Sequence, residues 1–278
     1  MSTSGLKPII FYDIPSIVQG RSCSPNTTKT WYVDCTQDFR LIVNRLTRRY
    51  CLTFKGLPFE TVWMECPKIK AFYEHNSLAP TTSCVIEGIP TPVHTLPVIM
   101  DPNTNKFVSD SFAIAQYLDE QYPDMPKVLP YGTAALIYAF QTAFLDASKN
   151  ATRMIMVKGA QTLNPETKEF YIPTREERFG IPWEEFSPPE KREAQWNELR
   201  AVFNTADGWY AKSSGQFILG DTPCFADFMV AGRLKWIQNC FEMQEWEEIK
   251  SWNGGRWGRL VEATDKYVLG LSEVEEGR

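Results

Sequence analysis

The sequence predicts a small α/β domain followed by an all-α domain. Short, apolar and β-prone runs occur at 8–13, 58–64 and 96–102, and segments of helical character separate them. After Pro130 no strand pattern remains, and the apolar residues recur at helical spacing. A mixed order of strands and helices favours a sheet covered by helices, so the fold class follows from this change of pattern along the chain.

The change of pattern coincides with a segment that contains three prolines and a glycine, residues 121–132, as is typical of a domain boundary. We therefore expect an N-terminal domain over 1–125 and a helical domain over 131–278. A fourth short strand is expected at 106–109, and a long irregular stretch with three prolines at 78–95. The expected helices are amphipathic or well capped and cover 67–76, 110–123, 133–159, 188–214, 224–241 and 244–264, with partial helix from Thr27 onward.

Composition and charge are those of an ordinary globular protein. Hydrophobic residues make up 43% of the 278 residues and charged residues 23%, which is ample material for a core. The net charge of −5 argues against a nucleic-acid binder, because phosphate contacts need a basic face. No apolar run approaches the roughly 20 residues needed to cross a bilayer, and the N-terminus lacks the features of a signal peptide. We therefore expect a cytoplasmic protein with no membrane partner.

The seven cysteines are scattered along the chain and form no CxxC pair. Their odd number and wide spacing argue against a disulfide framework and against a zinc site, so we expect free thiols in a reducing compartment. The chain has only two histidines, which excludes a histidine-rich metal centre. The sequence therefore predicts a protein without a metal cofactor.

The loop from Ser22 to Thr30 is the clearest candidate for a functional segment. It precedes residues of helical character, and the first N–H groups of a helix stabilise an anion. Ser24 in this loop is either a hydroxyl that helps to hold such an anion or an ordinary helix N-cap. Cys23 is either a reactive thiol at a helix start or a small packed residue. Asn26 either orients a ligand or only bends the loop.

Several motifs have an order and spacing that together resemble the glutathione transferase superfamily. They are TLPVI at 95–99, DSFAIAQYLDEQYP at 110–123 and FILGDTPCFADFMVA at 217–231. One branch, the fungal transferases related to bacterial β-aryl etherases, is resembled by FYDIPS at 11–16, SPNTTKT at 24–30, FKGLPFETVW at 54–63 and TREERFG at 174–180. The resemblance covers nearly the whole chain. It implies a thioredoxin-like N-terminal domain that binds glutathione and an all-α C-terminal domain.

The resemblance also implies roles for particular residues. Ser24 would hydrogen-bond the thiol of glutathione and favour its ionised form, which lowers the pKa of that thiol. Cys23 and Tyr12 are the alternative catalytic residues; a role for Cys23 would make the protein a thiol transferase, whereas a place inside a strand favours core packing for Tyr12. The glutathione-binding residues that the resemblance implies are Asn26, Leu96, Pro97, Asp110 and Ser111.

Two pairs of residues would contact defined parts of glutathione. Pro97 is cis in the family, and Leu96 before it would pair with the cysteinyl backbone; the alternative is a proline on an edge strand. Asp110 and Ser111 open a helix, where a side-chain oxygen and N–H groups suit the ammonium and carboxylate of the γ-glutamyl end. Capping alone would also explain both residues.

Other residues are weaker candidates. His94, Lys68 and Lys70 could meet the glycyl carboxylate, although Thr95 stands where many members have Gln. In the family, Asp227 would lock a helix start, but the N-cap position that is usually Ser or Thr is Cys224 here. The family's second substrate lies between the domains, and the candidates for that pocket, otherwise expected on the surface, are Arg153, Tyr171, Arg175 and Arg178.

The spacing between Lys29 and Gly56 exceeds that of related sequences by about 18 residues. Removing residues 32–49 leaves KTWYCLTFKG, which fits the family spacing. The segment is therefore either a true insertion or a translated intron, since its ends suit intron boundaries. If the segment is present in the protein, it perturbs the helix beside Ser24.

The sequence is consistent with two functions, one that of an enzyme and the other that of a binding protein. The first is a transferase that activates the thiol of glutathione for attack on a hydrophobic, aromatic electrophile, with an etherase-like variant that expels a phenol. The second is a non-catalytic protein that binds glutathione or aromatic ligands. The expected partners are glutathione, a hydrophobic small molecule and a second copy of the chain in a homodimer.

Overall fold

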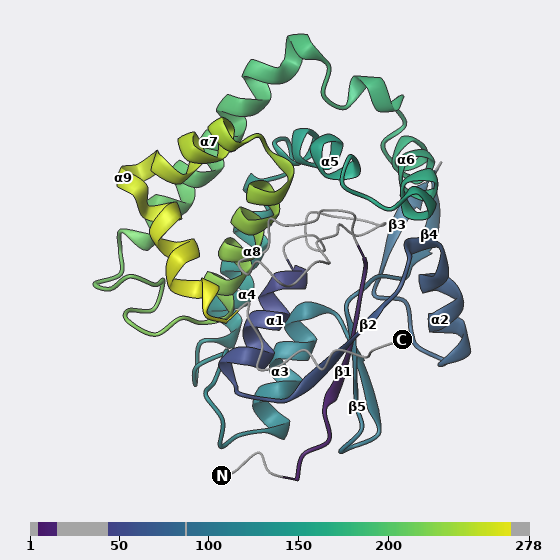
Figure 1. Cartoon of the computed structure of the whole chain (residues 1–278), viewed down its shortest axis with the longest axis vertical. Coiled ribbons are helices and arrows are strands. Elements are labelled where there is room, and N and C mark those ends of the chain that lie inside the picture. Colours follow the sequence, from purple (N-terminus) through teal and green to yellow (C-terminus); the bar gives the residue numbers. More distant parts are fainter. Residues whose placement is uncertain (1–4, 16–43, 87, 268–278) are drawn as a thin grey trace.

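The computed structural model describes residues 5–15, 44–86 and 88–267 and shows an α/β domain followed by a helical domain, as the sequence predicts (Figure 1). The strands are β1 (Ile9–Asp13), β2 (Phe59–Trp63), β3 (Thr82–Ile86), β4 (Ile89–Val93), β5 (Val98–Asp101) and β6 (Lys106–Ser109). The helices are α1 (Asn44–Phe54), α2 (Ile69–His75), α3 (Ser111–Gln121), α4 (Ala134–Ala147), α5 (Thr152–Ala160), α6 (Pro165–Phe179), α7 (Arg192–Tyr210), α8 (Phe225–Cys240) and α9 (Met243–Asp265). Short 3-10 turns are η1 (Cys66–Lys68), η2 (Trp183–Glu185) and η3 (Pro189–Lys191).

Four strands form the central sheet in the order β2-β1-β5-β6. β1 runs parallel to β2 and antiparallel to β5, and β6 returns antiparallel to β5. The C-terminal ends of β1, β2 and β6 and the N-terminal end of β5 therefore meet at one end of the sheet. We call this the upper end of the sheet.

Side chains along β1 alternate between the two faces of the sheet. Phe11 is fully buried and meets Phe59 edge-on, with ring centroids 6.4 Å apart. Tyr12 points to the opposite face, where its ring lies 4.5 Å from that of Phe72 on α2. Figure 1 shows α2 across the sheet from α1 and α3, so helices cover both faces.

Residues 78–95 are not the irregular stretch that the sequence predicts. They contain the two-stranded hairpin of β3 and β4, with Thr82 opposite Val93 and Ile86 opposite Ile89. Pro90 and Pro92 misled the prediction, because a proline cannot donate to a sheet. On β4 they are tolerated, since this strand pairs with β3 in a two-stranded sheet and no other described strand pairs with it.

Two predictions for the helical half are also wrong. The single helix expected at 133–159 is two helices, α4 and α5, separated where the Ser148 hydroxyl bonds the carbonyl of Phe144 at 2.7 Å. α6 was not among the expected helices, because Pro173 lies inside it. Both ends of α6 have residues that favour a helix terminus. Pro165 is the first residue of the helix, and Gly180, in the left-handed conformation (φ 64°), follows the last one.

The two domains pack together through α1 and α8. The ring of Tyr50 stacks on Phe228 with centroids 5.3 Å apart, and Phe54 meets the same ring edge-on at 5.4 Å. Tyr50 and Phe54 both lie on α1, whereas Phe228 lies on α8, far away in the sequence. α8 is buried along almost its whole length and forms the centre of the helical domain.

The start of α8 is held by Asp227, as the resemblance implies. Its carboxylate accepts hydrogen bonds from the backbone N–H groups of Cys224 and Ile218, each at 2.9 Å. Burial raises the pKa of this carboxyl, and these hydrogen bonds oppose the rise. The capping box therefore forms even though a thiol occupies the N-cap position.

The expectation that the cysteines are free thiols is wrong for Cys66. Cys66 is in a disulfide bond, whereas the other described cysteines, Cys51, Cys84, Cys224 and Cys240, are free. A disulfide depends on two thiols brought together by the fold, which their spacing along the chain does not reveal. Within the described ranges, no group of three or more His, Cys, Asp or Glu residues could hold a metal ion. None of the helices described is both long enough and apolar enough to cross a bilayer.

Candidate functional site

The residues that the sequence predicts for the reacting loop, Cys23, Ser24 and Asn26, lie outside the described residues. So does most of the predicted insertion at 32–49, of which residues 44–49 form the start of α1. The remaining predicted site residues are described. Some lie near the sheet, and others lie on α5 and α6.

Four of the predicted glutathione-binding residues meet at the upper end of the sheet. Val98 pairs with Ser109 across β5 and β6. Leu96 and Pro97 come immediately before Val98, and Asp110 and Ser111 immediately after Ser109, so the pairing brings these two dipeptides together. Tyr12 pairs with Val98 on the other side of β5, which places the end of β1 beside the same two segments.

The Leu96–Pro97 peptide bond is cis, as in the family that the sequence resembles. Both residues are buried. Pro97 precedes β5 rather than lying inside it, so the sheet loses no hydrogen bond to the proline. The preceding carbonyl, that of Thr95, accepts a hydrogen bond from the hydroxyl of Tyr73 at 2.5 Å. The hydroxyl of Tyr73, a residue of α2, thus holds the backbone before Pro97 in place.

Asp110 caps α3 in an uncommon backbone conformation. Its φ is 73°, a left-handed value that a residue other than glycine adopts at some cost. Its Oδ1 accepts from the N–H groups of Phe112 and Ala113 at 2.9 and 3.0 Å. The capping role expected from the sequence is therefore present, and both of these bonds go to one carboxylate oxygen.

Ser111 is the most informative residue at the upper end of the sheet. It is 1% exposed, and no described residue forms a hydrogen bond with its hydroxyl oxygen. A buried hydroxyl without a partner is destabilising by about 1–3 kcal/mol, so such groups are rare in native proteins. Its position at the first residue of α3 places it beside N–H groups that favour an anion. This pattern indicates a polar ligand.

Tyr12 lies within an aromatic cluster. Its ring is half-buried between Phe72, at 4.5 Å, and Phe107, at 6.3 Å between centroids. Burial raises the pKa of its hydroxyl, so the phenol stays neutral near pH 7. These contacts agree with core packing, the interpretation that its place in a strand favours.

The weaker candidates for the second-substrate pocket lie on α5 and α6. Arg153 is half-buried, with its guanidinium 5.5 Å from the ring centre of Phe179. Tyr171 is fully buried, and the guanidinium of Arg175 lies 4.1 Å from its ring centre. Arg178 lies 5.7 Å from Phe179. Each of these arginines therefore contacts an aromatic ring rather than standing in solvent.

The three candidates for the glycyl carboxylate lie near α2. Lys68 pairs with Glu166 of α6 at 3.6 Å, and Lys70 with Glu74 at 4.0 Å, both at exposed positions. His94 packs edge-on against Tyr73 with centroids 5.2 Å apart. Burial first, and the charge of Lys70 second, lower its pKa, so this imidazole is neutral at pH 7.

A contact that the sequence did not predict joins the end of β2 to the helical domain. Glu65 accepts a hydrogen bond from Asn164 at 2.6 Å and another from the hydroxyl of Thr167. Thr167 in turn accepts from the backbone N–H of Cys66 at 3.1 Å. Glu65 and Asn164 are 99 positions apart, so no local signal could have found this contact. It fixes the segment after β2 at the upper end of the sheet.

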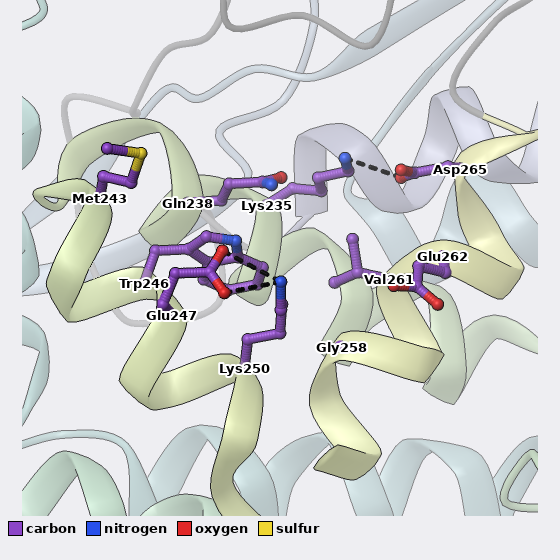
Figure 2. A pocket seen from close by; sticks show the side chains of 10 residues that line it. All are labelled: Lys235, Gln238, Met243, Trp246, Glu247, Lys250, Gly258, Val261, Glu262 and Asp265. Carbon is purple, nitrogen blue, oxygen red and sulfur yellow. Dashed lines mark hydrogen bonds and ion pairs between the residues drawn. The ribbon is translucent and has the colours of Figure 1, made fainter.

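A cavity of about 420 Å³ lies elsewhere, between α8 and the two halves of α9 (Figure 2). α9 is interrupted at Trp252–Gly255, where Asn253 and Gly254 have left-handed φ values of 53° and 66°. None of the predicted site residues lines this cavity. Four of its charged side chains form ion pairs, Lys235 with Asp265 and Lys250 with Glu247.

Comparisons with family models, with curated proteins and with solved structures all point to one family. Residues 48–121 match the family model of the glutathione S-transferase N-terminal domain, and residues 135–267 that of the C-terminal domain. Two glutathione S-transferases of Ceriporiopsis subvermispora, both solved in complex with glutathione, are similar. CsGST63524 is 33% identical over 96% of this chain and 100% of its own, with a TM-score of 0.81. CsGST83044 is 31% identical over 94% and 99%, with a TM-score of 0.80. The glutathione S-transferase-like protein ustS of Aspergillus flavus is 27% identical over 99% of this chain and 96% of its own.

Proposed function

This chain belongs to the glutathione S-transferase superfamily, and we propose that it binds glutathione at the upper end of its sheet and activates the thiol there. It is a glutathione transferase with a thioredoxin-like N-terminal domain and a helical C-terminal domain. Glutathione is the co-substrate, as it is the ligand of two similar structures. The observation that carries the proposal is the buried hydroxyl of Ser111, which has no partner within the described residues.

The residues at the upper end of the sheet suit both ends of the γ-glutamyl group. No described residue donates a hydrogen bond to Oδ2 of Asp110, which leaves that oxygen for the ammonium. The hydroxyl of Ser111 and the first turn of α3 suit the carboxylate. Leu96, held before a cis proline, offers its backbone to the cysteinyl part of glutathione.

Ser24 is the proposed catalytic residue. Its hydroxyl would donate a hydrogen bond to the sulfur of glutathione, which stabilises the thiolate and lowers the pKa of the thiol. The thiolate then attacks an electrophilic carbon of a hydrophobic, aromatic substrate, and a carbon–sulfur bond forms as the leaving group departs. In the etherase-like form of this reaction, the carbon–oxygen bond of an aryl ether breaks and a phenolate leaves. We place the second substrate between the domains, near Arg153 and Tyr171.

Turnover by two single variants tests this assignment, with a chloronitroaromatic and a β-aryl ether as substrates. We expect Ser24→Ala to lower kcat/KM by about 100-fold or more, because removal of one donor to a reacting anion has effects of that size. Tyr12→Phe should retain activity, because the ring contacts of Tyr12 do not need its hydroxyl. Full activity in Ser24→Ala would contradict the proposal.

Two other outcomes identify the alternative functions. Loss of activity in Cys23→Ala, together with a mixed disulfide between Cys23 and glutathione, would make the protein a thiol transferase. Retention on a glutathione column without turnover of either substrate would make it a non-catalytic binding protein. Mass measurement in solution tests the homodimer that we propose, and fractionation of cells tests a cytoplasmic location.

We also propose that residues 32–49 are additional to the family fold. The match to the N-terminal family model begins only at residue 48, which supports this. Sequencing the transcript decides between a true insertion and a translated intron. If the message contains these codons, comparison of turnover with and without the segment shows whether it impairs catalysis while glutathione binding survives.

A further inference from the structure

Arg233 is a buried cation with no anionic partner among the residues that the structure describes. It lies in the middle of α8, is 2% exposed, and is among the largest fully buried side chains of the protein. Among the residues that the structure describes, none accepts a hydrogen bond from its Nε, Nη1 or Nη2. Burial lowers the pKa of this guanidinium to about 9, so it still carries its charge at pH 7. Buried charges are normally paired, since an unpaired one is strongly destabilising.

The nearby acidic residues are engaged elsewhere. Asp227, also on α8, accepts from two backbone N–H groups at the helix start. Asp265 of α9 pairs with Lys235 at 2.7 Å, as Figure 2 shows. Lys235 is only two residues from Arg233 and equally buried. Lys235 has a carboxylate partner, whereas no carboxylate of 5–15, 44–86 or 88–267 pairs with Arg233.

Neutral groups do not replace the missing carboxylate. Gln141 on the adjacent α4 has a buried side-chain oxygen, but no described donor, Arg233 included, lies within hydrogen-bond distance of it. The guanidinium lies beside the ring of Trp236, whose centre is 5.3 Å away. A contact with an aromatic ring satisfies none of the five N–H donors of a guanidinium as a hydrogen-bond acceptor would, and Nε, Nη1 and Nη2 have no such acceptor among the described residues.

Further polar groups without partners follow Arg233 along the helix. The indole N–H of Trp236 and the side-chain amide of Asn239 are buried, and no described residue bonds them. They are three and six residues after Arg233, so each stands one turn further along α8. α5 lies close on this side, since a Cβ on Gly159 would come within 3.2 Å of the Trp236 ring. Three successive turns of α8 thus carry buried donors.

We propose that Arg233 is the receptor for an oxyanion, a carboxylate, phosphate or sulfate group, held inside the helical domain. A guanidinium edge presents two parallel N–H donors that match two oxygens of such a group, and it binds them more strongly than neutral donors do. Trp236 holds the guanidinium in place through its ring. Arg233 lies on α8, whereas the described residues proposed to bind glutathione lie just before β5 and at the start of α3. The ligand is either a free inorganic oxyanion or an organic acid.

Thermal unfolding of the full-length protein tests this site, with chloride, phosphate, sulfate or benzoate compared at equal ionic strength. We expect one of the oxyanions to raise the Tm over the chloride value by about 5 °C or more at a concentration 100 times its Kd. Phosphate or sulfate would identify an inorganic ligand, and benzoate an organic acid. Arg233→Met should lose the shift entirely, and its Tm in chloride should equal or exceed that of the unaltered protein.

Arg200→Met is the matched control, because Arg200 also lies 5.3 Å from a tryptophan ring centre, that of Trp252, but is exposed. It should keep the oxyanion shift. A protein that already holds its anion would show no shift, so ions released on acid denaturation are measured by ion chromatography. If the unaltered protein shows neither a shift nor a released oxyanion, the proposal is wrong. An equal Tm shift in Arg233→Met and in the unaltered protein also refutes the proposal. If Arg233→Met does not fold, Arg233→Lys replaces it, and its oxyanion shift should be smaller than that of the unaltered protein.

Discussion

The ammonium of Lys55 lies 2.8 Å from Oδ1 of Asp119, and both side chains are buried. Lys55 follows α1, and Asp119 belongs to α3. The same ammonium donates to the carbonyl of Pro126 at 3.1 Å, while Asp119 accepts from the backbone N–H of Leu129 at 2.8 Å. One ion pair therefore joins two helices of the N-terminal domain to the segment that leads into the helical domain.

Lys55→Met should lower the free energy of unfolding by about 3–5 kcal/mol, because it leaves the buried carboxylate of Asp119 without its cation. Urea denaturation followed by circular dichroism measures the change. Lys70→Met is the control, since Lys70 and Glu74 form an exposed pair at 4.0 Å, and its effect should stay within about 1 kcal/mol. Equal stability of the two variants would contradict the role given to Lys55.

Asp101 should make the stability of the protein depend on pH in the acid range. It is fully buried, which would raise its pKa, but hydrogen bonds from Tyr122 at 2.6 Å and Tyr117 at 2.7 Å, with two from Asn103, outweigh burial and lower it. A carboxyl with a lowered folded-state pKa contributes stability above its unfolded-state pKa of about 4 and loses it as pH falls through the folded-state value.

We therefore expect the free energy of unfolding of the unaltered protein to fall more steeply below about pH 4 than that of Asp101→Asn. Urea denaturation at a series of pH values between 5 and 2 measures both slopes. Asp124→Asn, at an exposed position, should leave the slope unchanged. An identical slope in Asp101→Asn and the unaltered protein would show that this carboxyl is not responsible.

Ser111→Ala should weaken glutathione binding without weakening the fold. The hydroxyl has no partner within the described residues, so its removal leaves no hydrogen-bonding group of the protein unsatisfied. A hydrogen bond to a charged ligand group contributes about 1.5–3 kcal/mol, so the Kd for glutathione should rise about 10- to 100-fold. Titration calorimetry measures the Kd, and thermal unfolding should give an unchanged or slightly higher Tm.

Ser148→Ala should give the opposite pattern. Ser148 is also buried, but its hydroxyl bonds the carbonyl of Phe144 at 2.7 Å, so its removal should cost about 1 kcal/mol of stability and leave glutathione binding intact. If Ser111→Ala binds glutathione as the unaltered protein does, the Ser111 hydroxyl does not contact the ligand.

The local features of this protein were predictable because they depend on residues a few positions apart. Asp110 caps N–H groups two and three residues ahead, and Asp227 those at the start of its own helix, so the sequence motif is enough to identify them. The same holds for β1 and β2, whose apolar residues alternate or run together. Local signals were misleading at two prolines, which argue against a strand or a helix. Pro90 lies in the strand β4, and Pro173 lies inside the helix α6.

The family, the two-part architecture and the residues that cap α3 and α8 could be predicted from the amino-acid sequence alone. Which residues have partners depends on how distant segments pack. The tertiary structure brings Leu96 beside Ser111 through the pairing of Val98 with Ser109, and it leaves the hydroxyl of Ser111 and the guanidinium of Arg233 buried without an acceptor or donor among the described residues. The physical reason is that burial and pairing depend on segments far apart in the chain, whereas propensity and capping depend on neighbours.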